Sequence, residues 1–228
     1  MRWFWKMLGM LCFAIVLLAG SVLTTHAQDS SSEDIAVRWV MAGIPKDADP
    51  SRPISVSPEA RMASGDRIKM YLSTRRKCFF YLFHQGPEGV LRLLFPAALP
   101  SRGLPGGTRL TVPQGEQWFE LDGQTGTETF HVLVSPAPLE AIETLYQDYV
   151  QHADRNGPSL TRLLSAFEQL RRQQRPLTSK AERPLSIGGT IRGASEPGAG
   201  ATEVQMDRLA EDIATRNVFC RTYTIEHH

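Results

Sequence analysis

The feature that most constrains this fold is the stretch from Ser64 to Pro96, because its side chains follow the two-residue repeat of β-strands. Apolar and polar residues alternate from Arg67 to Ser73, which predicts a strand with one buried face. Both faces are apolar and rich in aromatic residues from Cys78 to Gln85, as expected for a central strand covered on both sides. Turn residues from Gly86 to Gly89 precede another strand from Val90 to Phe95, so the last two strands are predicted to form an antiparallel hairpin.

Further short strands are predicted on both sides of this stretch. Gly- and Pro-containing turns separate them at close spacing, which favours a β domain over 35–136, built as an antiparallel β-sandwich or a barrel-like core. These predicted strands are Ile35 to Met41, Ile54 to Ser57, Thr108 to Val112, Gln117 to Leu121 and Thr127 to Ser135.

The pattern after the β domain changes to helical spacing. Two runs of apolar residues at that spacing predict a helical hairpin over 137–176. Gly, Pro and Ser dominate 177–202, which predicts a flexible linker. Residues 203–228 are predicted to hold a third helix, Val204 to Thr215, and a final strand, Val218 to Ile225, that returns to the sheet. The expected fold class is therefore mainly β with appended helices (α+β), with two or three C-terminal helices.

The N-terminus carries the features of a secretory signal peptide over 1–27. Basic Arg2 and Lys6 precede an apolar run from Leu8 to Leu18, and small residues precede a cleavage position at Ala27-Gln28. A periplasmic or secreted location is therefore expected, with a polar, flexible leader at 28–34. The alternative is an uncleaved anchor, although the apolar run is shorter than the roughly 20 residues of a spanning helix. No later apolar run is long enough for a membrane span.

Two cysteines remain after signal cleavage, because Cys12 lies within the signal. An even pair in an oxidising compartment suggests a disulfide between Cys78 and Cys220, which would place the final strand beside the Cys78 to Gln85 strand. The alternative is two separate buried thiols.

No catalytic, cofactor or metal site is predicted. The histidines show neither the HExxH pattern nor paired His/Cys spacing, and the serine-hydrolase motif G-x-S-x-G is missing. The glycine-rich stretches lack the Lys-Ser/Thr element of a phosphate loop. Glu226-His227-His228 is expected to be a solvated tail. A net charge of +1 gives no electrostatic footprint for nucleic acid.

Two tryptophans are candidates for a ligand platform. Trp118 lies on a short predicted strand between loops, and Trp39 lies on an early strand. An exposed indole ring can bind a glycan or a peptide, whereas the alternative for both residues is packing in the core.

A series of short motifs resembles a family of bacterial exported proteins that carry the domain of unknown function DUF4384. The resemblance covers roughly 64–149, and its pieces are Ser64-Gly65-Asp66-Arg67, Phe80-Tyr81-Leu82-Phe83, Leu93-Leu94-Phe95-Pro96, Leu104-Pro105-Gly106-Gly107-Thr108, Val112-Pro113, Gly126-Thr127-Glu128 and Phe130-His131-Val132. The chain departs from the family at the basic Arg75-Arg76-Lys77. The family has no established activity, so the resemblance implies compartment and architecture rather than chemistry.

These observations lead us to expect a non-enzymatic interaction module that binds a protein or a cell-envelope component. One alternative is a cell-envelope hydrolase whose unrecognised site lies in the loops around Pro96 to Gly107. The other is a glycan-binding module that uses Trp118.

Overall fold

The stretch from Ser64 to Pro96 forms three strands, β4 (Arg67–Thr74), β5 (Phe79–Gln85) and β6 (Leu91–Phe95). The computed structural model describes residues 34–152, 157–176 and 201–228. The predicted signal peptide, nearly all of the predicted leader and most of the predicted linker lie outside the described residues. Strands β5 and β6 pair antiparallel as predicted, but β4 lies in a different sheet.

The first sheet is built around β4 and the long strand β1 (Asp34–Ile44), which pair antiparallel along most of their length. The strand order is β10-β11-β1-β4-β7, with β2 beside β1 and β8 beside β4. The flanking strands are β2 (Ile54–Ser55), β7 (Arg109–Val112), β8 (Phe119–Glu120), β10 (Arg175–Pro176) and β11 (Glu211–Arg216).

The second sheet has the order β3-β12-β9-β5-β6. Its remaining strands are β3 (Glu59–Met62), β9 (Gly126–Ser135) and β12 (Phe219–His227). Strand β12 pairs parallel to β3 and antiparallel to β9, so the final strand does return to the sheet. It does not lie beside β5, however, because β9 separates the two. The two sheets of the described residues stay open, which makes this fold a sandwich rather than a closed barrel.

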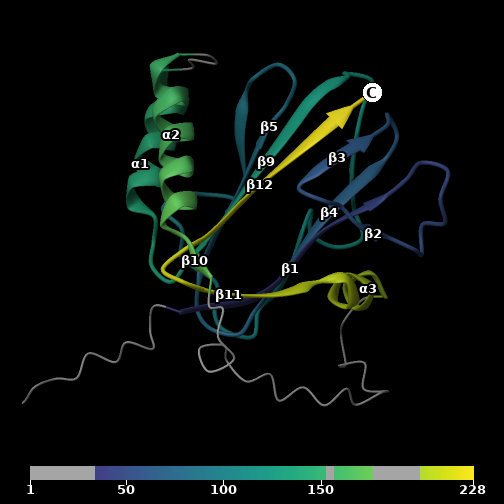
Figure 1. Cartoon of the computed structure of the whole chain (residues 1–228), viewed down its shortest axis with the longest axis horizontal. Coiled ribbons are helices and arrows are strands. Elements are labelled where there is room, and N and C mark those ends of the chain that lie inside the picture. The colour runs from purple at the N-terminus through teal and green to yellow at the C-terminus, as the bar shows by residue number, and fades with distance from the viewer. Residues whose placement is uncertain (1–33, 153–156, 177–200) are drawn as a thin grey trace, which may run out of the picture. The chain divides into compact units, whose positions relative to one another are not determined.

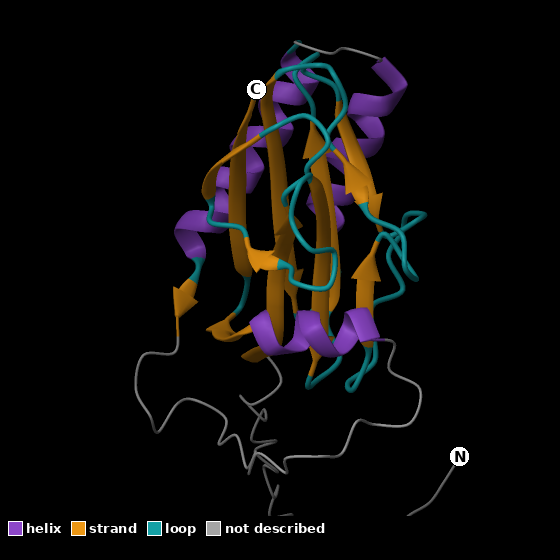
Figure 2. Cartoon of the chain, turned by 90° about the vertical axis from the view of Figure 1, so that its right-hand side faces the viewer, coloured by secondary structure: helices purple, strands orange, loops and turns teal. Residues whose placement is uncertain are grey.

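Three helices cover the outer faces of the two sheets (Figure 1). Helices α1 (Glu140–His152) and α2 (Pro158–Gln173) form the predicted hairpin and pack on the outer face of the sheet that contains β5. Helix α3 (Ala201–Leu209) packs on β1 and β4 of the other sheet. Figure 2 shows α3 in front of the strands and α1 and α2 behind them. This layering explains why both faces of β5 are apolar.

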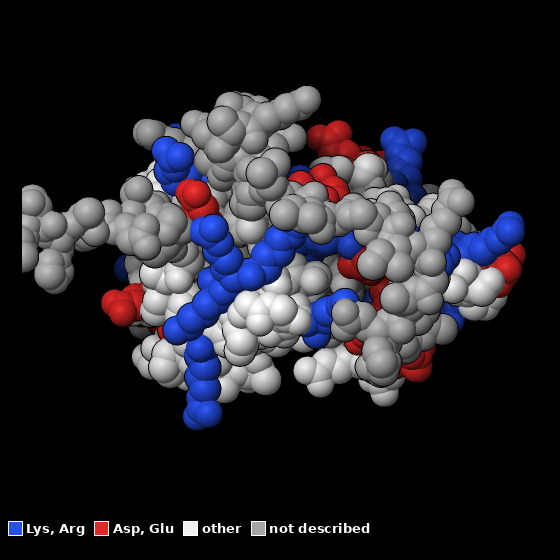
Figure 3. Space-filling view, turned by 90° about the horizontal axis from the view of Figure 1, so that it is seen from below, with Lys and Arg blue, Asp and Glu red and all other residues white. Residues whose placement is uncertain are grey.

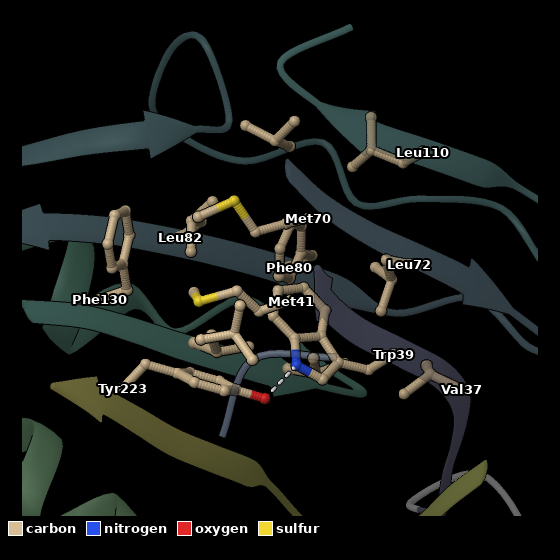
Figure 4. Close-up of a cluster of buried hydrophobic side chains, with 14 of the residues drawn as sticks. Val37, Trp39, Met41, Met70, Leu72, Phe80, Leu82, Leu110, Phe130 and Tyr223 are labelled. Atoms are coloured by element: carbon tan, nitrogen blue, oxygen red, sulfur yellow. Dashed lines mark hydrogen bonds between the residues drawn. The ribbon is translucent and has the colours of Figure 1, made fainter. Parts of the chain in front are cut away.

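The main core lies between the two sheets and contains large aromatic side chains from both (Figure 4). Trp39 is 1% exposed and its indole Nε1 donates a hydrogen bond of 2.8 Å to the hydroxyl of Tyr223. Its ring lies 5.7 Å from that of Phe80 between centroids. Each such side chain contributes roughly 1.5–3 kcal/mol through burial, so this cluster is the main source of cohesion between the sheets.

The predicted helix from Val204 to Thr215 is wrong in its second half. Helix α3 ends at Leu209, and β11 follows immediately and pairs antiparallel with β1. Ile213 is buried opposite Val37, so the same apolar spacing that fits a helix also fits a strand. The open edge of β1 decides between them, because its backbone groups need partners. Strand β3 was also not predicted, since its four residues include the exposed Glu59.

Candidate functional site

The two tryptophans predicted as a ligand platform occupy different environments. The prediction for Trp39 is wrong, because its ring is enclosed between the sheets. Trp118 is half-buried beside α3, and the Lys69 ammonium lies 5.7 Å from the centre of its ring. Part of the Trp118 ring is therefore already used in packing.

The two cysteines are free in the structure, and the geometry does not allow the Cys78–Cys220 disulfide. Cys78 belongs to the core between the sheets, whereas Cys220 on β12 belongs to the cluster under α1 and α2. Strand β9 lies between β12 and β5, so their Cα atoms are at least two strand spacings apart, beyond the roughly 7 Å that a disulfide spans. Burial raises the pKa of Cys78 to about 11 and that of Cys220 to about 12, so neither is a thiolate nucleophile at neutral pH.

A hollow of about 570 Å³ lies between helix α1 and the loop that follows β6. We call it the α1 groove. It is lined by Leu93, Pro96, Ala97, Ala98, Leu99, Tyr146, Gln147, Val150 and Gln151. This loop is the one that the sequence singled out at Pro96, and α1 supplies the opposite wall.

Two tyrosine hydroxyls of α1 attach the helix to the edge of β6. The Tyr149 hydroxyl accepts a hydrogen bond of 3.0 Å from the backbone N–H of Leu91, and the Tyr146 hydroxyl accepts one of 3.0 Å from Leu93. These two N–H groups are donors that an edge strand otherwise presents to an incoming strand. A ligand therefore cannot bind here by extending the sheet, and it has to use side-chain contacts.

A buried carboxylate fixes the loop that follows β6, which forms one wall of the groove. Glu143 of α1 is 6% exposed, and its Oε1 accepts hydrogen bonds from the Tyr81 hydroxyl at 2.6 Å and from the Ser101 backbone N–H at 3.0 Å. The Tyr81 hydroxyl also accepts a hydrogen bond of 3.1 Å from the N–H of Leu139. Burial and the hydrogen bond to Glu143 raise the pKa of Tyr81. Sheet, helix and loop are thus locked together by one network.

The lining of the α1 groove carries no charged side chain. Val150 is 55% exposed, and Ile54 is the other large apolar residue with such exposure among the described residues. Apolar walls with a few amide and hydroxyl groups are typical of sites that bind uncharged organic ligands or peptide segments.

A second cluster of polar side chains lies at the end of the sandwich where β12 finishes. His84 Nε2 lies 2.5 Å from Glu128 Oε2, and Glu128 Oε1 lies 3.9 Å from His227 Nδ1. His227 Nε2 in turn lies 3.0 Å from Ser64 Oγ. The side chain of His227 is fully buried, and its Nδ1 has no hydrogen-bond partner among the described residues.

The order Ser64, His227, Glu128 resembles the nucleophile, base and orienting acid of an acyl-transfer site. Such a site also needs free backbone N–H donors for the oxyanion. The N–H of Ser64 is bonded to the carbonyl of His228, and that of Gly65 is bonded to the carbonyl of Leu121. The 3.9 Å separation between His227 and Glu128 is also longer than a hydrogen bond. The contacts of this cluster link residues of β5, β9 and β12 with Ser64, which precedes β4.

Sequence reasoning missed this cluster, because it treated Glu226-His227-His228 as a solvated tail. That prediction is wrong for His227, which continues the core-facing alternation of Tyr223 and Ile225 on β12. Glu128 is likewise in phase with the buried Phe130 on β9. The alternation of each strand, extended by two residues, is the signal that points to these side chains.

No three His, Cys, Asp or Glu side chains within the described ranges are arranged to hold a metal ion. No helix there combines the length and the apolar character that crossing a membrane requires.

Comparison with known proteins gives one match. Residues 61–138 match the family model of DUF4384, a domain of unknown function. Neither a curated protein nor a solved structure matches the chain. The match includes the loop wall of the α1 groove, whereas α1 itself and β12 lie outside it. Over residues 61–138 the chain is therefore similar to the DUF4384 domain.

Proposed function

We propose that this protein is an exported, non-enzymatic binding module whose α1 groove takes an uncharged segment of a protein partner in the cell envelope. The observation that carries the proposal is the α1 groove itself, a rigidly framed hollow with an uncharged lining and an exposed apolar residue, Val150. The signal-peptide features of 1–27 support export.

The chemistry of the groove favours a peptide segment over a charged ligand. Gln147 and Gln151 offer amide groups that both donate and accept hydrogen bonds, as the backbone of an extended peptide requires. Leu93, Leu99 and Val150 offer apolar contact for a side chain of that peptide. An anionic or cationic ligand would lose its hydration without gaining an opposite charge.

The fixed frame of the groove supports binding with little reorganisation. The hydrogen bonds of Tyr146, Tyr149 and Glu143 hold α1, the β6 edge and the loop in one arrangement. Affinity rises when a site does not have to be ordered on binding, because less conformational entropy is lost.

The test is affinity capture from the cell-envelope fraction with the full chain as bait. We compare the natural protein with Val150→Glu, which puts a charge in the groove, and with Ile54→Glu as the matched control. Ile54 has the same exposed fraction as Val150, 55%, but lies on β2, away from the groove. The proposal expects one partner that is captured by the natural protein and by Ile54→Glu but lost with Val150→Glu. Equal capture by both variants, with unchanged thermal stability, contradicts it.

The second candidate, a cell-envelope hydrolase, has one observation in its favour, the 3.0 Å contact between Ser64 Oγ and His227 Nε2. A fluorophosphonate probe separates the two functions, because it labels an activated serine. The binding-module proposal expects no labelling. Labelling that disappears in Ser64→Ala would establish the hydrolase instead.

A further inference from the structure

Another hollow, of about 460 Å³, lies where the loop after β1, the turn before β4 and the turn after β8 meet. We call it the polar hollow, because most of its side chains are charged or carry a hydroxyl group. Two of them are basic, Lys46 and Arg67, two are acidic, Glu120 and Asp122, and one is the hydroxyl-bearing Ser64. No residue of the polar hollow lines the α1 groove, so the proposals for the two sites can fail separately.

The three segments around the polar hollow are joined through the turn before β4. The carboxylate of Asp66 accepts a hydrogen bond of 2.8 Å from the backbone N–H of Lys46 and one of 2.9 Å from the N–H of Ala63. The N–H of Gly65 donates to the Leu121 carbonyl at 2.7 Å, and the N–H of Leu121 donates to the Asp66 carbonyl at 2.9 Å. The backbone of the polar hollow is therefore fixed before any ligand binds.

Two side chains of the polar hollow are positioned by close contacts. Gly65 has a φ of +90°, and a Cβ atom there would lie 2.7 Å from Lys46 Cδ, so the Lys46 stem lies directly on the Gly65 backbone. The Ser64 hydroxyl lies 3.0 Å from Nε2 of His227, whose side chain is fully buried. The ammonium group and the hydroxyl therefore come from side chains whose stems are held in place.

The polar hollow brings charges of both signs together in equal number. Arg67 and Glu120 are direct partners in the pairing of β4 with β8, so their side chains leave the same face of the sheet. Lys46 and Asp122 add one charge of each sign. An anion would therefore meet two carboxylates as well as two basic groups, and a cation would meet the same mixture.

Charges of opposite sign also lie close together elsewhere on the surface, as one face of the molecule shows (Figure 3). Some of these charges neutralise each other, as Arg75 and Asp212 do in an ion pair of 2.6 Å. Within the described residues, none of Lys46, Arg67 and Glu120 takes part in an ion pair. Their charged groups are therefore open to a ligand.

We propose that the polar hollow binds a small ligand that carries both a carboxylate and an ammonium group, as a free amino acid or a short peptide does. The carboxylate of the ligand binds to Lys46 and Arg67, and its ammonium group binds to Glu120 and Asp122. The Ser64 hydroxyl adds a group that can donate or accept a hydrogen bond. A ligand with both charges gains from the whole lining, whereas a ligand with one charge is repelled by half of it.

The test follows the binding of dialanine to the full chain through the backbone amide signals of Gly65 and Gly123 in nuclear magnetic resonance spectra. Three probes differ in charge: dialanine with both termini free, N-acetyl-dialanine, which keeps only the carboxylate, and dialanine amide, which keeps only the ammonium group. The variant Arg67→Gln removes a positive charge from the polar hollow, and Glu120→Gln removes a negative one. The matched controls, Arg52→Gln and Glu59→Gln, change exposed residues that do not line the polar hollow.

We expect dialanine to shift both signals until they saturate, and to bind about fivefold more tightly than either singly charged probe, as the loss of one exposed ion pair implies. Each variant weakens the binding of dialanine, and the controls bind it as the natural protein does. Arg67→Gln also strengthens the binding of dialanine amide, and Glu120→Gln that of N-acetyl-dialanine, because each removes a repelling charge. A misfolded variant cannot produce such a gain.

Three results overturn the proposal. The first is the absence of a saturable shift with dialanine, and the second is equal affinity for the three probes. The third is tighter binding of N-acetyl-dialanine than of dialanine, because the ligand is then a simple anion. Equal effects of the variants and their controls also contradict it, because the bound charges then lie outside the polar hollow.

Discussion

His131 gives the sharpest prediction about stability, because the folded chain holds it in a place that disfavours its charged form. It lies on β9 facing α2, and its ring centre is 4.9 Å from that of Phe167. Its Nδ1 lies 3.3 Å from Thr222 Oγ1, and its Nε2 is buried without a partner among the described residues. Burial lowers the pKa of His131 to about 4, although the carboxylate of Glu168 acts in the opposite direction.

The sign and size of the pH effect follow from this shift. The unfolded chain has an ordinary histidine with a pKa of 6.5. Below that pH the unfolded state binds a proton that the folded state does not, so the free energy of unfolding falls as the pH falls toward 4. Between about pH 7.5 and about pH 4.5 the loss from His131 alone is about 2.5 kcal/mol.

The assay is urea unfolding at both pH values for the natural protein and two variants. His131→Gln stays neutral throughout and keeps a side chain that can bond to Thr222, so it lacks the histidine contribution. His152→Gln is the control, because the His152 side chain is 62% exposed on α1. We expect His131→Gln to lose about 2.5 kcal/mol less stability than the natural protein on acidification, and His152→Gln to behave like the natural protein. An equal loss in His131→Gln and the natural protein would show that burial of His131 does not make the fold sensitive to acid.

Three further predictions concern groups that the fold buries. Cys78 and Cys220 are free, so we expect the chain that begins at Gln28, which lacks Cys12, to take up two alkyl groups by intact mass when it is denatured without reduction. Uptake of none contradicts the fold. Lys69 donates hydrogen bonds to the carbonyls of Gly115 and Gln117 at 2.5 Å, so Lys69→Met is expected to lower the free energy of unfolding in urea by about 2 kcal/mol. An unchanged unfolding midpoint contradicts a stabilising role for these two hydrogen bonds. Tyr149→Phe removes the acceptor for the N–H of Leu91, so we expect that amide hydrogen to exchange faster, while the amide hydrogens of the distant strand β12 are unaffected. Equal protection of the Leu91 amide in both proteins contradicts the hydrogen bond from the β6 edge to Tyr149.

Strands were predictable from sequence where alternation is strong, but their partners were not. The two apolar faces of β5 indicated cover on both sides, and the other sheet and the helix pair α1 and α2 provide it. Nothing local showed that the chain changes sheets at Arg75 to Cys78, because alternation specifies a strand and not its neighbour. The segment Glu211 to Arg216 was assigned wrongly for the same reason, since the edge of β1 selects its conformation.

The same limit applies to the candidate site: features of one local segment could be predicted, and contacts between distant segments could not. The loop after Pro96 was recognisable from its Pro and Gly content, and it does form one wall of the α1 groove. The other wall comes from α1, some 50 residues later, which no local pattern placed there. The contact of Ser64 with His227 joins residues that are 163 positions apart in the sequence.

Site-specific photocrosslinking in living cells tests whether the α1 groove binds a protein partner. A benzophenone amino acid replaces Val150 in one sample and Ile54 in the other, and both positions have the same exposed fraction, 55%. We expect a discrete protein adduct from position 150 and none from position 54. The absence of any adduct from position 150, or the same adduct from both positions, would contradict it.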